Sequence, residues 1–362
     1  MILILAKLPP EVIGGVEKVA GQYAQILSQY ERVIYLTFGK NKSVHIRRKQ
    51  NYIIIELPKL FSIGNYSFSF SYILLIMRLR KKVRLVNIHI PFPLIFELST
   101  ILCYEKTIAT IHSFISRYNL LNFLLDKIQI FTLNFVYKVI VTSEYYKLKF
   151  KTKAMTVETL PLWLDDEGSC ESSKVDFGLP SKYVIFIGRF GRYKGLDVLA
   201  EVVDRTEMEN IQFVVAGSGN YLPDKLKHQK NVQIIPRFVT EAEKYYLLKN
   251  SFIFLFPSTD EGEAFGLMQL EAMRQGIPVI NTNLKSGVPY VSLDGVSGIT
   301  IEPNNAKQLS GAISKIYNDK KLHSFLSSGS KNRFNSMFSS NKTKVNLINI
   351  FDILDGCGKK SN

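Results

Sequence analysis

Cysteine is scarce in this sequence, and paired metal ligands are missing. The three cysteines, Cys103, Cys170 and Cys357, lie far apart along 362 residues, which argues against a disulfide framework and favours a reducing compartment. The sequence contains no HxxxH, CxxC or DxD pattern. We therefore expect no tightly bound metal ion.

Long hydrophobic runs are also missing. The apolar run at the N-terminus ends at Ala6, too short for the core of a secretory signal, and no cationic stretch precedes it. The longest candidate for a membrane span, residues 72–77, ends at Arg78, whereas a span needs about 20 apolar residues. We expect a cytoplasmic protein.

The composition is that of a globular chain, with 46% hydrophobic and 21% charged residues. A single core stops growing near ~250–300 residues, so this length predicts two domains. Residues 1–160 carry 22 Lys and Arg against 9 Asp and Glu, whereas residues 161–362 carry 24 against 22. The excess positive charge in the first half fits an anionic membrane surface, a nucleic acid, or a basic face without a partner.

Short apolar runs alternate with helical patterns along most of the chain. The strand-like runs are residues 2–5, 32–39, 52–57, 85–90, 107–111, 138–141, 183–187, 211–216, 232–235, 252–256, 278–281 and 298–301. This alternation predicts the α/β class, with parallel sheets covered by helices on both faces. Residues 160–182 lack an apolar period and are predicted to contain a linker.

The chain thus divides into two doubly wound, Rossmann-like halves. We predict an N-terminal domain over 1–165, a C-terminal domain over 175–330, and terminal helices over 331–362 that pack back towards the N-terminal domain. Ligands of open α/β sheets bind at the carboxyl ends of the strands. The cleft between two such domains is the first place to expect a site.

Two loops carry residues suited to phosphate. Gly14 and Gly15 follow the first strand and open the first helix, where backbone amides can approach an anion. Arg189 and Lys194 share the loop after strand 183–187, where two cations can hold a diphosphate. The alternatives are a plain tight turn for the glycines and solvated cations for the loop.

Two glutamates bracket the start of a predicted helix in the stretch DEGEAFGLMQLEAMRQGIPV. Glu263 precedes the helix, beside amides that can bind an anion or a hydroxyl, and Glu271 lies inside the helix on its protein-facing stripe. A buried glutamate needs a partner, and ribose hydroxyls would serve. The alternative is an ordinary helix with two solvated acids.

Two histidines lie at strand ends. His112 follows strand 107–111, and either a ligand or a structural hydrogen bond accounts for it equally well. His89, near the end of strand 85–90, is more simply interpreted as structural.

These motifs together resemble the retaining GT-B glycosyltransferases of family 4, of the bacterial O-antigen and capsule type. The resemblance covers nearly the whole chain and is strongest over residues 188–303. It depends on Gly14-Gly15-Val-Glu17, Thr110-Ile-His112-Ser113, Gly188-Arg189 with Lys194-Gly195, Ala216-Gly-Ser-Gly219, Glu263-Ala-Phe-Gly-Leu with Glu271-Ala-Met, and Gly276-Ile-Pro278.

The resemblance implies a GT-B fold, two Rossmann-like domains facing each other across a cleft, and roles for individual residues. Arg189 and Lys194 would bind the donor phosphates, Glu263 the donor sugar, and Glu271 the ribose, while His112 would lie beside the reacting sugar. The catalytic set would be His112, Arg189, Lys194 and Glu263. Further substrate contacts would come from Gly14, Gly15, Arg237, Phe238, Val239, Ala264, Phe265, Gly266, Leu267 and Glu271.

The implied activity is transfer of a hexose, mannose-like or glucose/GlcNAc-like, from a nucleotide diphosphate sugar to a lipid-linked saccharide. The configuration at the anomeric carbon would be retained, with no metal and no cofactor. The basic N-terminal domain would contact the inner face of the cell membrane, with residues 61–84 as the lipid-facing candidates, and no nucleic acid would be bound. The alternatives are another GT-B enzyme, such as a sugar-nucleotide epimerase, or a basic binding protein without activity.

Overall fold

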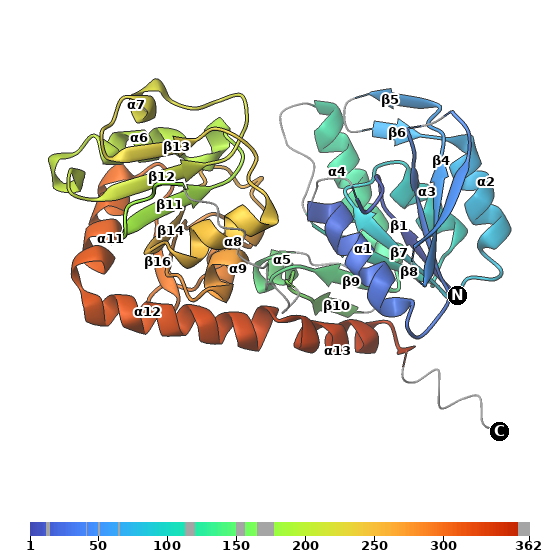
Figure 1. Ribbon diagram of the computed structural model, residues 1–362. Helices are drawn as coiled ribbons and strands as arrows, with labels where there is room; N and C mark the ends of the chain where they lie inside the picture. The colour runs from blue at the N-terminus through green and yellow to red at the C-terminus, as the bar shows by residue number, and fades with distance from the viewer. Residues whose placement is uncertain are drawn as a thin grey trace. The chain divides into compact units, whose positions relative to one another are not determined.

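The computed structural model describes residues 1–11, 15–40, 42–49, 51–63, 66–112, 120–149, 156–164 and 177–353. Contacts divide the chain into two compact units (Figure 1). Unit 1 comprises Met1–Pro161 and Thr343–Asn362, and unit 2 comprises Leu162–Lys342. Residues 165–176 of the predicted linker lie outside the described residues.

Unit 1 is built on an eight-stranded sheet in the order β10-β9-β8-β7-β1-β2-β4-β3. All neighbouring strands are parallel except β3 and β4, which are antiparallel. The strands are β1 (Ile2–Leu5), β2 (Val33–Phe38), β3 (His45–Lys49), β4 (Tyr52–Leu57), β7 (Leu85–Ile90), β8 (Thr107–Ile111), β9 (Lys138–Val141) and β10 (Thr156–Thr159). A separate hairpin pairs β5 (Phe61–Ile63) with β6 (Tyr66–Phe68).

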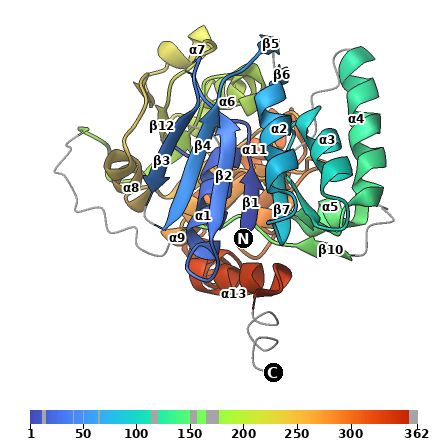
Figure 2. The same ribbon diagram turned by 90° about the vertical axis from the view of Figure 1, so that its right-hand side faces the viewer.

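Helix α1 packs against this sheet through an apolar stripe. It buries Val19, Ala20, Tyr23, Ala24 and Leu27, the stripe expected from their 3.6-residue spacing. Helices α2, α3 and α4 lie side by side (Figure 2). The helices are α1 (Gly15–Leu27), α2 (Phe70–Leu79), α3 (Ile95–Leu102), α4 (Leu120–Thr132), the 3₁₀ turn η1 (Leu133–Phe135), α5 (Glu144–Lys149) and α13 (Ser340–Ile350), of which residues 340–342 belong to unit 2.

The C-terminal segment of the described chain is fixed to unit 1 by polar contacts. Lys138 Nζ on β9 lies 2.9 Å from Asp352 Oδ1, and Arg84 donates to the Phe351 carbonyl at 3.1 Å. The ring of Phe351 meets that of Tyr23 edge-on, with centroids 6.3 Å apart. These contacts explain why residues distant in sequence belong to the same unit.

Unit 2 is built on a six-stranded, fully parallel sheet in the order β13-β12-β11-β14-β15-β16. The strands are β11 (Tyr183–Ile187), β12 (Gln212–Ala216), β13 (Val232–Ile235), β14 (Ile253–Phe256), β15 (Val279–Thr282) and β16 (Gly298–Ile301). They are short and almost continuously apolar, as expected of strands buried on both faces.

Helices surround the sheet of unit 2, and α6 and α11 share one core cluster with β11, β12 and β14. The helices are the 3₁₀ turn η2 (Arg192–Lys194), α6 (Leu196–Val203), η3 (Thr206–Met208), α7 (Asp224–Lys227), α8 (Glu241–Lys249), α9 (Leu267–Arg274), α10 (Val288–Val291), α11 (Ala306–Asn318), α12 (Lys320–Arg333) and the π-helical turn η4 (Phe334–Phe338). Residue 331, the predicted start of the terminal helices, thus lies inside α12.

Every strand predicted from an apolar run is present, with ends shifted by at most a residue or two. The sequence analysis missed β3, β5, β6 and β10. Strand β3 reads HIRRK and is mostly exposed at the sheet edge, so no apolar pattern marks it. None of the helices in the described ranges is both long enough and apolar enough to cross a membrane.

Gly195, in the loop after β11, packs closely against Pro257, in the loop after β14. Its φ is +73°, and a Cβ at this position would lie 1.9 Å from the carbonyl oxygen of Pro257. We therefore expect Gly195→Ala to lower the free energy of unfolding by at least ~2 kcal/mol. Urea unfolding followed by the fluorescence of Trp163, the one tryptophan and a buried residue of unit 2, measures this.

Gly311 provides the matched control. It lies on α11, where a Cβ would meet no atom within 4 Å. Gly311→Ala should leave the stability unchanged or raise it by up to ~1 kcal/mol. Equal unfolding midpoints for the two variants would contradict the packing argument.

Candidate active site

The strand order of unit 2 places its switch point between β11 and β14. The chain builds β11, β12 and β13 in one direction and then returns to add β14 on the other side of β11. The loops after β11 and β14 therefore diverge at the carboxyl edge of the sheet, which is where ligands of open α/β sheets bind. Arg189, Lys194 and Glu263 all lie in these two loops.

Lys194 and Glu263 form an ion pair across the switch point, with Lys194 Nζ donating to Glu263 Oε2. Both side chains are mostly buried, and Lys194 Nζ also lies 5.1 Å from the ring centroids of Tyr193 and Phe256. The backbone reinforces the contact, because the Thr259 amide donates to the Tyr193 carbonyl at 2.8 Å. The structure thus brings together two residues that the sequence separates by 69 positions.

The backbone itself forms the adjoining surface of the site. The Phe190 amide donates to the Ser218 carbonyl at 2.8 Å, and Phe190 bridges to Gly219, so pairing continues beyond the ends of β11 and β12. A Cβ on Gly217 would lie 1.8 Å from the Gly188 carbonyl oxygen, and one on Gly219 would lie 2.1 Å from that of Phe190. Glycine is therefore required at both positions.

The N-terminus of α9 is held in place by a buried polar network. Gly266 precedes the helix with φ +83°, and a Cβ there would meet the ring of Phe256 at 2.6 Å. The side-chain amide of Gln269 donates to the Phe265 carbonyl at 3.1 Å and accepts from Asn281 at 2.9 Å. The first amides of α9 have no acceptor within the helix and carry partial positive charge.

Glu271 has a protein partner. Lys244 Nζ on α8 lies 2.6 Å from Glu271 Oε2 and 2.9 Å from Oε1, and it also donates to the exposed Glu241. Burial lowers the pKa of Lys244, but the two carboxylates raise it by more. The sequence analysis missed Lys244, because no local pattern reveals that α8 and α9 adjoin. A ribose contact of Glu271 stays a prediction.

The predicted base-binding segment forms the loop between β13 and α8. Arg237 makes a two-pronged pair with Glu243, at 2.7 and 2.8 Å, and this pair lowers the pKa of Glu243 to about 2. Glu243 also completes a capping box with Thr240 at the start of α8. Phe238 is exposed and Val239 is buried. The same helix carries Lys244, so this loop and Glu271 are linked through α8.

Arg189 differs from its neighbours in being exposed. None of the residues in the described ranges forms a salt bridge or hydrogen bond with its guanidinium. In those ranges, no group of three or more His, Cys, Asp or Glu side chains is arranged to hold a metal ion.

The candidate residues of unit 1 lie at the carboxyl edge of its own sheet. His89 Nδ1 and His112 Nε2 are 2.8 Å apart, and the two rings stack with centroids 5.1 Å apart. Burial lowers the pKa of His112 to about 3 and that of His89 well below its ordinary value. One ring therefore donates to the other while both are neutral. Gly15 starts α1 at this edge, whereas Gly14 lies outside the described residues.

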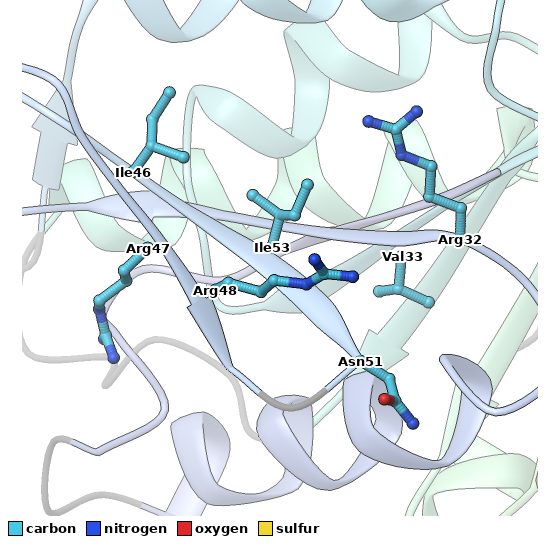
Figure 3. A pocket seen from close by; sticks show the side chains of 7 residues that line it. All are labelled: Arg32, Val33, Ile46, Arg47, Arg48, Asn51 and Ile53. Atoms are coloured by element: carbon cyan, nitrogen blue, oxygen red, sulfur yellow. The ribbon is translucent and has the colours of Figure 1, made fainter.

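A pocket on unit 1 lies at the opposite edge of the sheet (Figure 3). Its lining consists of Arg32, Val33, Ile46, Arg47, Arg48, Asn51 and Ile53. These residues flank the amino ends of β2 and β4, so the pocket is separate from the histidine pair. The Arg47 side chain points away from Arg48 in Figure 3 and pairs with Glu11 and Glu56.

Comparison with known proteins defines the class. Residues 171–333 match the family described as Glycosyl transferases group 1. The structure is similar to that of sucrose-phosphate synthase (tll1590) from Thermosynechococcus elongatus, with a TM-score of 0.75, and the match covers 98% of this chain and 99% of the other at 17% identity. The chain therefore has the GT-B fold and contains a glycosyltransferase group 1 domain, which includes Arg189, Lys194, Glu263 and Glu271.

Curated relatives extend over almost the full length. The chain is 24% identical to O-antigen chain mannosyltransferase C of Escherichia coli, covering 95% of this chain and 96% of the relative. It is 22% identical to D-rhamnosyltransferase WbpZ of Pseudomonas aeruginosa, covering 91% and 90%. Both relatives are glycosyltransferases by name, which agrees with the family of residues 171–333.

The Lys244–Glu271 pair should show strong coupling between its members. Removing one partner leaves a buried charge, so Lys244→Met and Glu271→Met should each cost ~3–5 kcal/mol of stability, whereas the double variant should cost much less. Urea unfolding of the four proteins gives the coupling energy. Glu241→Ala, which removes the exposed partner of Lys244, should change stability by ~0.5 kcal/mol or less. Additive losses in the double variant would refute a buried pair.

The two histidines should make unit 1 sensitive to mild acid. They stay neutral when folded but titrate near pH ~6.5 when unfolded, so the unfolded state takes up more protons and stability falls as the pH drops from 7.5 to 5. We expect His89→Gln to reduce this loss and His45→Gln, at an exposed site on β3, to leave it unchanged. Thermal unfolding by circular dichroism measures it, and ¹⁵N signals of His89 and His112 that titrate between pH 5 and 7 would contradict the assignment.

Proposed function

We propose that the protein transfers a hexose from a nucleotide diphosphate sugar to a lipid-linked saccharide during synthesis of a surface polysaccharide. The observation that carries the proposal is the Lys194–Glu263 pair at the switch point of unit 2, beside the N-terminus of α9. A mannose-type sugar is favoured, because the two relatives are named as a mannosyltransferase and a D-rhamnosyltransferase and cover nearly the whole chain.

The chemistry assigned to each residue follows from its charge. Departure of the nucleoside diphosphate builds negative charge on the β-phosphate. Lys194, the exposed Arg189 and the first amides of α9 would stabilise that charge, since fixed donors are effective where charge develops. Glu263 would accept hydrogen bonds from donor sugar hydroxyls while its contact with Lys194 keeps the carboxylate oriented.

The remaining roles extend along the donor. The backbone from Ala264 to Leu267 would contact the sugar or β-phosphate, Glu271 would accept from the ribose, and the loop 237–239 would contact the base. Lys244 has a positioning role, because it fixes the Glu271 carboxylate from the adjoining helix. Gly14, Gly15 and His112 would serve the donor or the reacting sugar from unit 1.

Retention of the anomeric configuration, without a metal ion, belongs to the same proposal and is supported by the family resemblance of the motifs. Cations at the leaving group can supply the charge stabilisation that a metal supplies elsewhere. We place the protein in the cytoplasm, at the inner face of the cell membrane. The excess of cations in the first 160 residues supports this location.

The decisive variants are Lys194→Gln and Glu263→Gln. Each should reduce transfer at least ~100-fold, because charge stabilisation or sugar positioning is lost at the reacting centre. Product formation is measured with a panel of GDP- and UDP-sugars and a polyprenyl-diphosphate saccharide, and the anomeric configuration of the product is read by NMR. Lys315→Ala, an exposed lysine on α11, should retain full activity.

Thermal unfolding with GDP and UDP separates binding from chemistry, since a ligand that binds the folded state raises the melting temperature. One nucleotide should stabilise the wild type and should do so less in Lys194→Gln. Near-normal transfer by either variant would refute the assigned roles. Conversion of the donor sugar without transfer would indicate an epimerase, and the absence of any nucleotide shift would favour a binding protein without activity.

A further inference from the structure

Helix α4 packs with its polar side chains inward. The buried residues include Asp126, Gln129 and Thr132, and both amide atoms of Gln129 lack a hydrogen-bond partner among the described residues. The exposed ones are Phe123, Leu124, Ile128, Ile130 and Phe131, the last with 63% of its surface accessible. A helix facing water on a globular domain has the opposite arrangement. Burial of an unpartnered amide costs free energy, so this orientation indicates an apolar environment outside.

Helix α3, which contacts α4, buries the apolar side chains Ile95 and Phe96 in the usual way. It also buries Ser99 and Thr100 and exposes Leu98 and Ile101. Helix α2, on the other side of α3, buries Tyr72 and Ile76 normally but exposes three further apolar side chains, Phe70, Leu74 and Met77.

The three helices lie side by side (Figure 2), and their exposed side chains form the outer surface of this part of unit 1. We call this surface the apolar face and represent it by six exposed residues: Phe70, Leu74, Ile101, Leu124, Ile128 and Phe131. Contiguous apolar surface on a soluble protein is commonly a binding site.

The exposed charges at the end of α2 are positive, whereas the loop after α3 carries one exposed acid, Glu105. Arg78, Arg80, Lys81 and Lys82 are exposed at the end of α2, and Lys127 Nζ lies over the ring of Phe123, 4.6 Å from its centroid. The two acids of these helices do not offset this charge at the surface, since Glu97 is half-buried and Asp126 is buried.

We propose that the apolar face docks on an anionic lipid surface, with its aromatic and aliphatic side chains inserted at the level of the headgroups and its cations on the lipid phosphates. Amphipathic helices bind membranes by these two contributions together. A second copy of the chain fits this surface less well. In a two-fold interface the cations of α2 would either face the same cations of the other copy, which repel them, or lie outside the interface without an anionic partner.

This proposal rests on the proposed function and names the surface of the protein that would contact the membrane. The net charge alone does not locate that surface. It predicts an apolar contribution that salt does not remove. An attraction between charges alone would be lost at high salt, where the Debye length falls to ~3 Å.

The experiment is co-sedimentation of the full chain with vesicles of phosphatidylcholine, with and without phosphatidylglycerol, at ~0.1 M and ~1 M salt. Wild type should bind the anionic vesicles and keep a measurable part of that binding at high salt. Phe131→Asp should reduce the affinity at least ~10-fold at both salt concentrations. Lys81→Glu with Lys82→Glu should weaken binding mainly at low salt.

Phe325→Asp is the matched control, because Phe325 on α12 of unit 2 is 62% exposed, close to the value for Phe131. It should bind vesicles as the wild type does. All variants are checked by circular dichroism and by their thermal shift with nucleoside diphosphate. That shift should be unchanged in Phe131→Asp, so failure to dock is distinguishable from failure of the donor site.

Three outcomes would overturn the proposal. The first is wild type that stays in the supernatant at both salt concentrations, and the second is Phe131→Asp that binds as wild type does. The third is a stable dimer, seen by analytical ultracentrifugation, that Phe131→Asp dissociates without changing vesicle binding. That result would assign the apolar face to a second copy of the chain.

Discussion

The contact between two loops at the switch point of unit 2 is the interaction on which the candidate site depends. The loop after β11 and the loop after β14 touch through Gly195 and Pro257, through the Thr259 amide and through the Lys194–Glu263 pair. Each contact positions the next, because backbone packing fixes the spacing at which the two charges meet. The cations proposed to bind phosphate and the carboxylate proposed to bind sugar hydroxyls thereby share one edge of the sheet.

Much of this arrangement was predictable from the sequence. Apolar runs located the main strands, and the rule that ligands bind at carboxyl ends singled out the loops of Arg189, Lys194 and Glu263. The histidine pair shows the limit, because His112 was predicted as a site residue whereas its hydrogen bond to His89 depends on the register between β7 and β8. Lys244 was missed because tertiary packing alone brings α8 to Glu271, and the role of Gln269 was missed because its bond to Asn281 depends on the packing of α9 on β15.

The distribution of charge along the sequence indicated a class of partner but not the surface that would bind it. The excess of cations in the first half directed attention to an anionic partner, but composition does not tell which face a side chain occupies. An apolar stripe on a helix predicts burial, and α4 reverses this expectation by burying Gln129 and exposing Phe131. Only the orientation of the helix on its sheet distinguishes a core stripe from a docking surface.

The glycines beside the switch point limit which positions of the candidate site can be altered by substitution. Where Gly217 and Gly219 lie against the carbonyls of Gly188 and Phe190, the surface of the site is main chain. Main chain presents the same groups whatever the neighbouring side chains become, so substitution cannot reshape this part of the site. Variation at this part of the site is therefore left to exposed side chains around it, such as that of Phe238.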